Sequence, residues 1–128
     1  AEILAFVGLE ARGCDVASSL PYGELRLLEV AIALAARPKL LLLDEPASGL
    51  DVAESEALGD LLLDLAAEGM AVLMVEHDVE MVMKVCSLIH VLDFGRIICI
   101  GTPREVQADP HVHAAYLGAE EPLEEAAS

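Results

Sequence analysis

Two carboxylates follow a short apolar run in this chain. Residues 40–43 are four consecutive leucines, and Asp44 and Glu45 come directly after them. A run of this kind predicts a strand buried on both faces, as in a parallel α/β sheet. Ligands of open α/β sheets bind at the carboxyl ends of the strands. One carboxylate at that place can hold a phosphate-bound Mg²⁺, and the other can orient an attacking water.

The alternative is that these acids only cap a helix after a core strand. Pro46 and the turn-forming residues 47–49 follow them instead of a helical pattern, which weakens that interpretation. The helix is predicted to begin later, with Asp51 as N-cap and Glu54 completing a variant of the capping box. The leucines of this helix then recur at i, i+3, i+4 and i+7 and form one apolar face, Leu58, Leu61, Leu62 and Leu65.

A histidine follows the next predicted strand. Residues 71–75 form a second apolar run, which Glu76 and His77 follow. Two parallel strands joined by one helix make a right-handed βαβ unit, and both strands then end at the same sheet edge. A lone histidine is more often structural than functional. The position of His77 at the same edge as Asp44 and Glu45 favours a functional site.

The order and spacing of these features resemble those of ABC transporter ATPases. Residues 40–46 are similar to the family's Walker B motif, residues 48–51 to its D-loop and residues 75–78 to its switch-histidine loop. Residues 19–24 stand where the family has its signature sequence, usually L-S-G-G-Q. The P-Y-G form of the signature, the E-H-D loop and the ending at residues 109–118 are most similar to the ATP-binding subunits of branched-chain amino acid importers.

The resemblance covers residues 1–118 and implies an α/β fold. The expected architecture is a mostly parallel sheet with flanking helices, the C-terminal half of a P-loop NTPase domain. The chain contains no Walker A sequence, G-x-x-x-x-G-K-[ST], and its only glutamine is too far downstream to be the Q-loop residue. We expect residues 1–37 to end the helical subdomain with the signature helix, residues 38–118 to be the C-terminal part of the catalytic core, and residues 119–128 to form an acidic, disordered tail.

The resemblance also implies residue roles, in a head-to-tail dimer of ATPase domains around two ATP molecules. Asp44 would hold Mg²⁺, Glu45 would polarise the attacking water, and His77 would contact the γ-phosphate. Asp51 would link the two sites across the dimer. The remaining nucleotide contacts would come from the signature segment, which consists of Leu20, Pro21, Tyr22, Gly23 and Glu24.

The signature segment departs from the usual family sequence. Pro21 replaces the serine, so the hydroxyl contact to nucleotide is lost. Tyr22 replaces the first glycine and Glu24 the glutamine, whereas Gly23 is retained. Ile32 stands where the family usually has an arginine.

Composition restricts the partners. The formal net charge is −16, which makes nucleic acid and anionic lipid poor partners. No apolar run reaches the roughly 18 residues of a membrane helix, and no signal peptide is visible. The expected location is the cytoplasm, at the inner face of the cell membrane, through permease subunits.

ATP and Mg²⁺ are expected as cofactors of the complete parent protein, whereas this fragment alone is expected to bind neither tightly and to be inactive.

Three questions stay open at this point. The chain is predicted to be an ATP-hydrolysing subunit of an importer, but it could instead be a non-catalytic half-domain that acts as an oligomerisation or interaction module. In either case we expect a homo-oligomer. Branched-chain amino acids follow from the resemblance alone, because an amide or urea importer would look alike.

His111 and His113 could bind a metal, but two ligands are too few for a closed zinc site, and a surface helix start is favoured.

Overall fold

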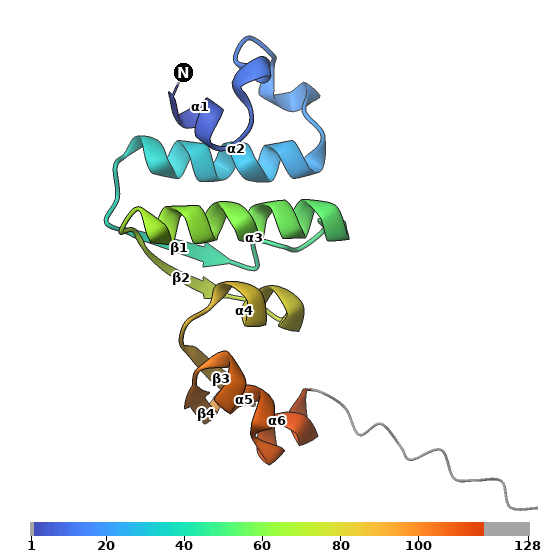
Figure 1. Ribbon diagram of the computed structural model, residues 1–128. Helices are drawn as coiled ribbons and strands as arrows, with labels where there is room; N and C mark the ends of the chain where they lie inside the picture. The colour runs from blue at the N-terminus through green and yellow to red at the C-terminus, as the bar shows by residue number, and fades with distance from the viewer. Residues whose placement is uncertain (1, 117–128) are drawn as a thin grey trace, which may run out of the picture. The chain divides into compact units, whose positions relative to one another are not determined.

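The computed structural model describes residues 2–116, and Figure 1 shows the order of their elements. The chain divides after Val85 into two compact units. Helices and strands alternate between residues 22 and 93, which confirms the predicted α/β class. The strands form two separate pairs among the described residues, one parallel and one antiparallel, and not one mostly parallel sheet.

The first unit contains the predicted βαβ arrangement. The apolar runs predict strands over residues 40–44 and 71–75, and both have these bounds. The helices predicted over residues 2–8, 22–37, 52–68 and 79–86 begin where predicted but end one or two residues earlier. The expected loop over residues 9–19 contains two short 3₁₀ turns. The elements are α1 (Glu2–Phe6), η1 (Glu10–Arg12), η2 (Ala17–Ser19), α2 (Tyr22–Ala35), β1 (Leu40–Asp44), α3 (Val52–Ala67), β2 (Ala71–Val75) and α4 (Val79–Val85).

Strands β1 and β2 pair in parallel, as predicted. Their register places Leu40 beside Ala71 and Asp44 beside Val75. Because α3 makes the crossover between them, the residues after both strands leave the sheet at the same edge. This topology positions the candidate site.

Helix α3 supplies the centre of the first core. The four leucines of its predicted apolar face are all buried, and Leu62 is completely inaccessible. Figure 1 shows α2 and α3 running alongside each other next to the two strands. Helix α4 differs from expectation, because its most buried residue is Met81 and not a member of the predicted face, which was Val79, Val82, Met83 and Cys86.

Only one face of the β1–β2 pair is covered. Leu41 belongs to the buried core, and Leu43, Val72 and Met74 pack against it. The opposite face is open to solvent, so the prediction that both faces are buried is wrong for this structure. An apolar run indicates that a face can be buried, but the elements that cover it decide whether it is. The open face consists of Leu40, Leu42, Leu73 and Val75, which are 49%, 65%, 60% and 63% exposed.

The second unit is a hairpin followed by two short helices. It consists of β3 (Ile89–Asp93), β4 (Arg96–Gly101), α5 (Pro103–Ala108) and α6 (Pro110–Ala115). Phe94 and Gly95 both have positive φ, at 45° and 74°, as a two-residue type I′ turn requires. The sequence Asp-Phe-Gly-Arg at residues 93–96 predicts a hairpin turn, and the structure confirms it. Its core contains Ile89, Val91, Val106 and Val112.

Carboxylates cap both helices of the second unit. Thr102 followed three residues later by Glu105 predicts a capping box. The backbone N–H of Thr102 donates to Oε2 of Glu105 at 2.8 Å, which confirms it. Oδ1 of Asp109 accepts from the N–H groups of His111 and Val112, at 2.8 and 3.2 Å. His111 and His113 therefore lie in a short surface helix, as favoured, and the described residues contain no group of three or more potential metal ligands.

These caps predict an acid-sensitive second unit. Hydrogen bonds from the backbone of Thr102 and Val112 lower the pKa of Glu105 and of Asp109, respectively, below their usual values. A lowered carboxyl pKa stabilises the folded state above the unfolded pKa, and this contribution is lost as pH falls through the folded pKa. In an NMR titration, both carboxyls should titrate at lower pH than in a short peptide of residues 102–113. Equal midpoints in chain and peptide would contradict the prediction.

Candidate functional site

The ends of β1 and β2 bring a carboxylate and an imidazole together. Oε1 of Glu45 lies 3.5 Å from Nδ1 of His77, and the two side chains are 52% and 71% exposed. Asp44, the last residue of β1, is also exposed at this edge. Asp44 and Glu45 thus reach the same sheet edge as His77, which is distant from them in sequence, because the strands are parallel. The exposure of both side chains leaves the Glu45–His77 pair accessible to water.

Glu45 has an unusual backbone conformation. Its φ is 47°, in the left-handed region, which costs a residue with a side chain about 1–2 kcal/mol. Its N–H donates to the carbonyl oxygen of Val75 at 2.8 Å, and its own carbonyl accepts from Ser48 N–H at 3.1 Å. The chain therefore turns sharply at Glu45 directly after the strand.

A further carboxylate, Glu76, lies between the two strand exits. Its Oε1 accepts from the N–H of Ala47 at 2.7 Å, and its Oε2 accepts from the N–H of His77 at 3.0 Å. The sequence pattern predicts no role for this residue. Its position directly after an apolar strand and before His77 is the only signal that could have found it.

Tyr22, predicted to contact nucleotide, is bonded within the chain. Its hydroxyl donates to the carbonyl oxygen of Ser48 at 3.1 Å and accepts from Nη2 of Arg26 at 2.6 Å. The Arg26 guanidinium also lies 5.1 Å from the centroid of the tyrosine ring. The side chain of Tyr22 therefore ties the start of α2 to the turn at residues 48–51.

The other signature residues are placed differently. Glu24 pairs with Arg12, at 3.0 Å from its Nε, and so is also bonded within the chain. Gly23 is buried, and a Cβ atom there would lie 2.2 Å from Oε1 of Glu54. Leu20 is partly buried and Pro21 is exposed at the N-cap position of α2. Because Pro21 offers no capping side chain, the backbone N–H groups of the first turn are the groups best suited to an anion.

Asp51 forms the predicted capping box of α3. Its Oδ1 accepts from the N–H of Glu54 at 2.8 Å, and its own N–H donates to Oε2 of Glu54 at 3.0 Å. Because Glu54 also lies against Gly23, the starts of α2 and α3 meet at this carboxylate. The proposed role of Asp51 across a dimer remains a prediction.

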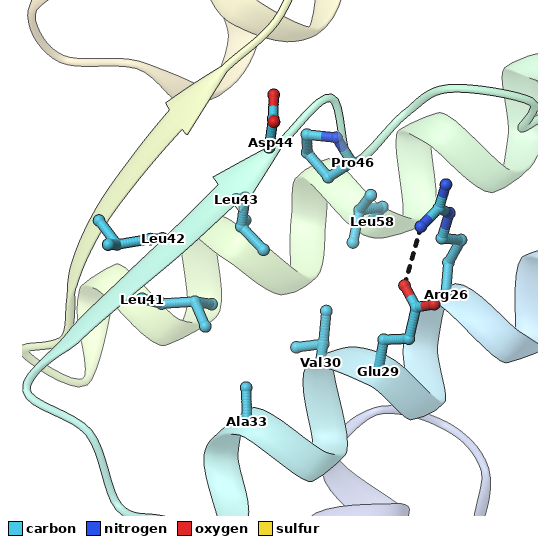
Figure 2. A pocket seen from close by; sticks show the side chains of 10 residues that line it. All are labelled: Arg26, Glu29, Val30, Ala33, Leu41, Leu42, Leu43, Asp44, Pro46 and Leu58. Carbon is cyan, nitrogen blue, oxygen red and sulfur yellow. Dashed lines mark hydrogen bonds and ion pairs between the residues drawn. The ribbon is translucent and has the colours of Figure 1, made fainter.

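A cavity of about 230 Å³ lies beside this site, between α2 and β1 (Figure 2). Arg26 and Glu29 form an ion pair at its edge, with 2.8 Å between Nη1 and Oε2. The hydrogen bond to Glu29 is the main cause that raises the pKa of Arg26 above its usual value. The lining is largely apolar, so the cavity does not suit a triphosphate. The lining residues are Arg26, Glu29, Val30, Ala33, Leu41, Leu42, Leu43, Asp44, Pro46 and Leu58.

Comparison with known proteins identifies the family. A family model described as "Branched-chain amino acid ATP-binding cassette transporter" matches residues 96–122. The branched-chain amino acid transport ATP-binding protein LivG of Salmonella typhimurium is 38% identical over 113 residues, which cover 88% of this chain. A crystal structure of the ADP conformation of an ABC transporter's ATP-binding cassette matches 91% of the chain, with a TM-score of 0.83 and 30% identity. This chain belongs to the ABC transporter ATP-binding domains.

The matched proteins are longer than this chain, and their names give more than one cargo. The chain spans 44% of the length of LivG and 48% of that crystallised cassette. The lipopolysaccharide export protein LptB of Haemophilus influenzae is also 38% identical, over 104 residues. Similarity to ABC ATP-binding domains thus extends to systems with different cargo. Among residues 2–116, no helix is long and apolar enough to cross a membrane.

Proposed function

We propose that this chain is the C-terminal part of an ATP-hydrolysing subunit of an importer for branched-chain amino acids. The observation that carries the proposal is the 3.5 Å approach of Glu45 Oε1 to His77 Nδ1 at the exits of two parallel strands. Similarity to LivG supports the choice of branched-chain amino acids. The carboxylates of Asp44 and Glu45 and the imidazole of His77 provide the groups that phosphoryl transfer to water requires.

The exposed side chains of Asp44, Glu45 and His77 fit Mg²⁺ and a nucleotide. Mg²⁺ is commonly bound by one or two carboxylates together with substrate phosphates and water, and Asp44 offers an exposed carboxylate at the strand end. Bound Mg²⁺ would neutralise charge on the phosphates. Glu45 would accept a hydrogen bond from the attacking water, and His77 would donate one to a phosphate oxygen. Both side chains are exposed enough to reach a ligand.

The proposed partners are a second ATPase subunit and membrane permease subunits. In that assembly the signature segment and Asp51 would face nucleotide held by the opposite subunit. The protein would act in the cytoplasm, at the inner face of the cell membrane. The strong negative charge of the chain supports partners other than nucleic acid.

We expect this chain alone neither to bind Mg-ATP tightly nor to hydrolyse it. The backbone amides and lysine of a Walker A loop are not in its sequence, and Asp44 and Glu45 would repel an uncompensated triphosphate. Isothermal titration calorimetry with Mg-ATP should show no micromolar binding. Micromolar binding, or turnover that Glu45→Gln abolishes, would contradict this expectation.

Complementation tests the proposed function itself. The chain would be mixed with the part of LivG that its match does not cover, and ATP hydrolysis measured. Activity should appear only in the mixture, and Glu45→Gln should lower it about a hundredfold or more, as loss of a general base does. Glu80→Gln, an exposed acid of α4, is the control and should leave activity unchanged. A properly folded mixture without activity would count against the proposal.

A second candidate is a self-associating module without catalysis. The open β1–β2 face favours it, because contiguous exposed apolar surface marks sites of protein association. We expect a dimer or larger oligomer by light scattering, and we expect Leu42→Lys and Leu73→Lys to shift the mass toward monomer. Leu63→Lys, a substitution on α3 at a leucine that is 37% exposed, should not. A monomer at high concentration would exclude this candidate.

A further inference from the structure

We propose that Glu76 is the positioning residue of this site, which holds the turn after β1 against the turn after β2 and so sets the Glu45–His77 distance. The catalytic meaning of that distance rests on the proposed function. The positioning itself depends only on this chain's own geometry.

The two oxygens of the Glu76 carboxylate serve different turns. Oε1 accepts from Ala47, two residues after Glu45, at 2.7 Å. Oε2 accepts from the N–H groups of His77 and Asp78, at 3.0 and 3.3 Å. Three backbone donors from two strand exits thus converge on one side chain. Hydrogen bonds to an ionised carboxylate are roughly twice as strong as those between neutral groups.

The Ala47 hydrogen bond matters because of where it lies. Ala47 is 8% exposed, so water replaces a lost partner of its N–H poorly, and an unpaired buried donor is costly. The turn also contains Glu45, whose φ of 47° persists only if surrounding contacts hold it. Two backbone hydrogen bonds also hold this turn. The N–H of Glu45 donates to the carbonyl of Val75, and the N–H of Ser48 donates to the carbonyl of Glu45. Glu76 adds a side-chain bond between the turn and the chain that carries His77.

The geometry requires a glutamate at position 76. Glutamine offers one acceptor oxygen, so it can serve Ala47 or the His77–Asp78 pair but not both, and its NH₂ group would then face a backbone donor. Aspartate is shorter by one methylene. The Glu76 carboxylate accepts from backbone N–H groups, so its proposed role is to position other residues and not to contact a ligand.

Amide hydrogen exchange and NOE measurements on the chain test the proposal. Glu76→Ala should speed exchange at Ala47, His77 and Asp78 by at least about tenfold, the factor that loss of such a hydrogen bond gives. It should also weaken the NOE between the Glu45 side chain and the His77 ring. Glu80→Ala is the matched control and should change neither readout. The amides of Ala71 and Leu73, which the register of β2 directs at β1, report whether the unit stays folded.

Two outcomes would overturn the proposal. One is unchanged exchange at Ala47 with an unchanged NOE in Glu76→Ala. If that variant loses protection in β2, Glu76→Gln decides: it should keep protection at one of the two turns and lose it at the other, and wild-type protection at both would refute the proposal. None of these readouts involves nucleotide, so a failure of the proposed ATPase activity would leave them unaffected.

Discussion

Replacing Leu62 with alanine should destabilise the first unit by about 3 kcal/mol, within the range measured for buried leucines. Leu62 is completely inaccessible, and its neighbours on the same face of α3, Leu58 and Leu65, are 1% and 3% exposed. Truncation removes apolar contacts and leaves a cavity that the parallel strands and α2 cannot readily fill. A loss of that size is a large part of the stability of an ordinary domain, about 5–15 kcal/mol.

Urea denaturation followed by circular dichroism measures this effect. Leu63→Ala is the matched control, since Leu63 is the next residue of the same helix but is 37% exposed. Its substitution should cost less than about 1 kcal/mol, because part of that surface already meets water. Similar losses for the two variants would show that α3 does not pack as described.

Gly49→Ala should have the second largest effect and should act on the signature segment. Gly49 has a φ of 78°, and a Cβ atom there would lie 2.9 Å from Cε1 of Tyr22. The left-handed conformation alone costs alanine about 1–2 kcal/mol. The clash adds to this cost and pushes the Tyr22 ring away from the Ser48 carbonyl. We expect a total loss of about 2–3 kcal/mol when both effects act together.

Gly69→Ala separates the two effects. Gly69 follows α3 with a φ of 94°, and a Cβ atom there would meet nothing within 4 Å. Its substitution should show only the backbone cost. In a Tyr22→Ala background, the cost of Gly49→Ala should fall toward that of Gly69→Ala. Equal losses from the two glycines in the wild-type background would show that Tyr22 does not pack on this turn.

The contact between Tyr22 and this turn bears on the predicted role of the signature segment. Tyr22 and Glu24 were predicted to contact nucleotide, and in this structure their side chains are bonded within the chain, to Ser48 and to Arg12. Under the proposed function, the segment would then meet an opposite nucleotide mainly through its backbone. Tyr22 links the signature segment to the turn that leads to Asp51.

The sequence alone determined the local elements and the direction of the strands. The leucines of α3 recur with the helical period, and Asp51 and Thr102 begin capping boxes that the structure confirms. These features depend on neighbours within one or two turns, so a linear pattern records them. The order strand, helix, strand also sufficed to predict that Asp44, Glu45 and His77 share one sheet edge, because right-handed crossovers leave parallel strands ending together.

Tertiary structure decided the contacts between distant segments. Nothing in the pattern around Glu76 indicates that its carboxylate reaches the N–H of Ala47, 29 residues away. The same holds for Tyr22 and Ser48, and for the open face of β1, where an apolar run predicts burial but does not name the covering element. Such contacts depend on how helices and turns are placed in three dimensions. Residue type and spacing do not encode that placement, because one carboxylate or tyrosine can satisfy its hydrogen bonds with many different backbone groups.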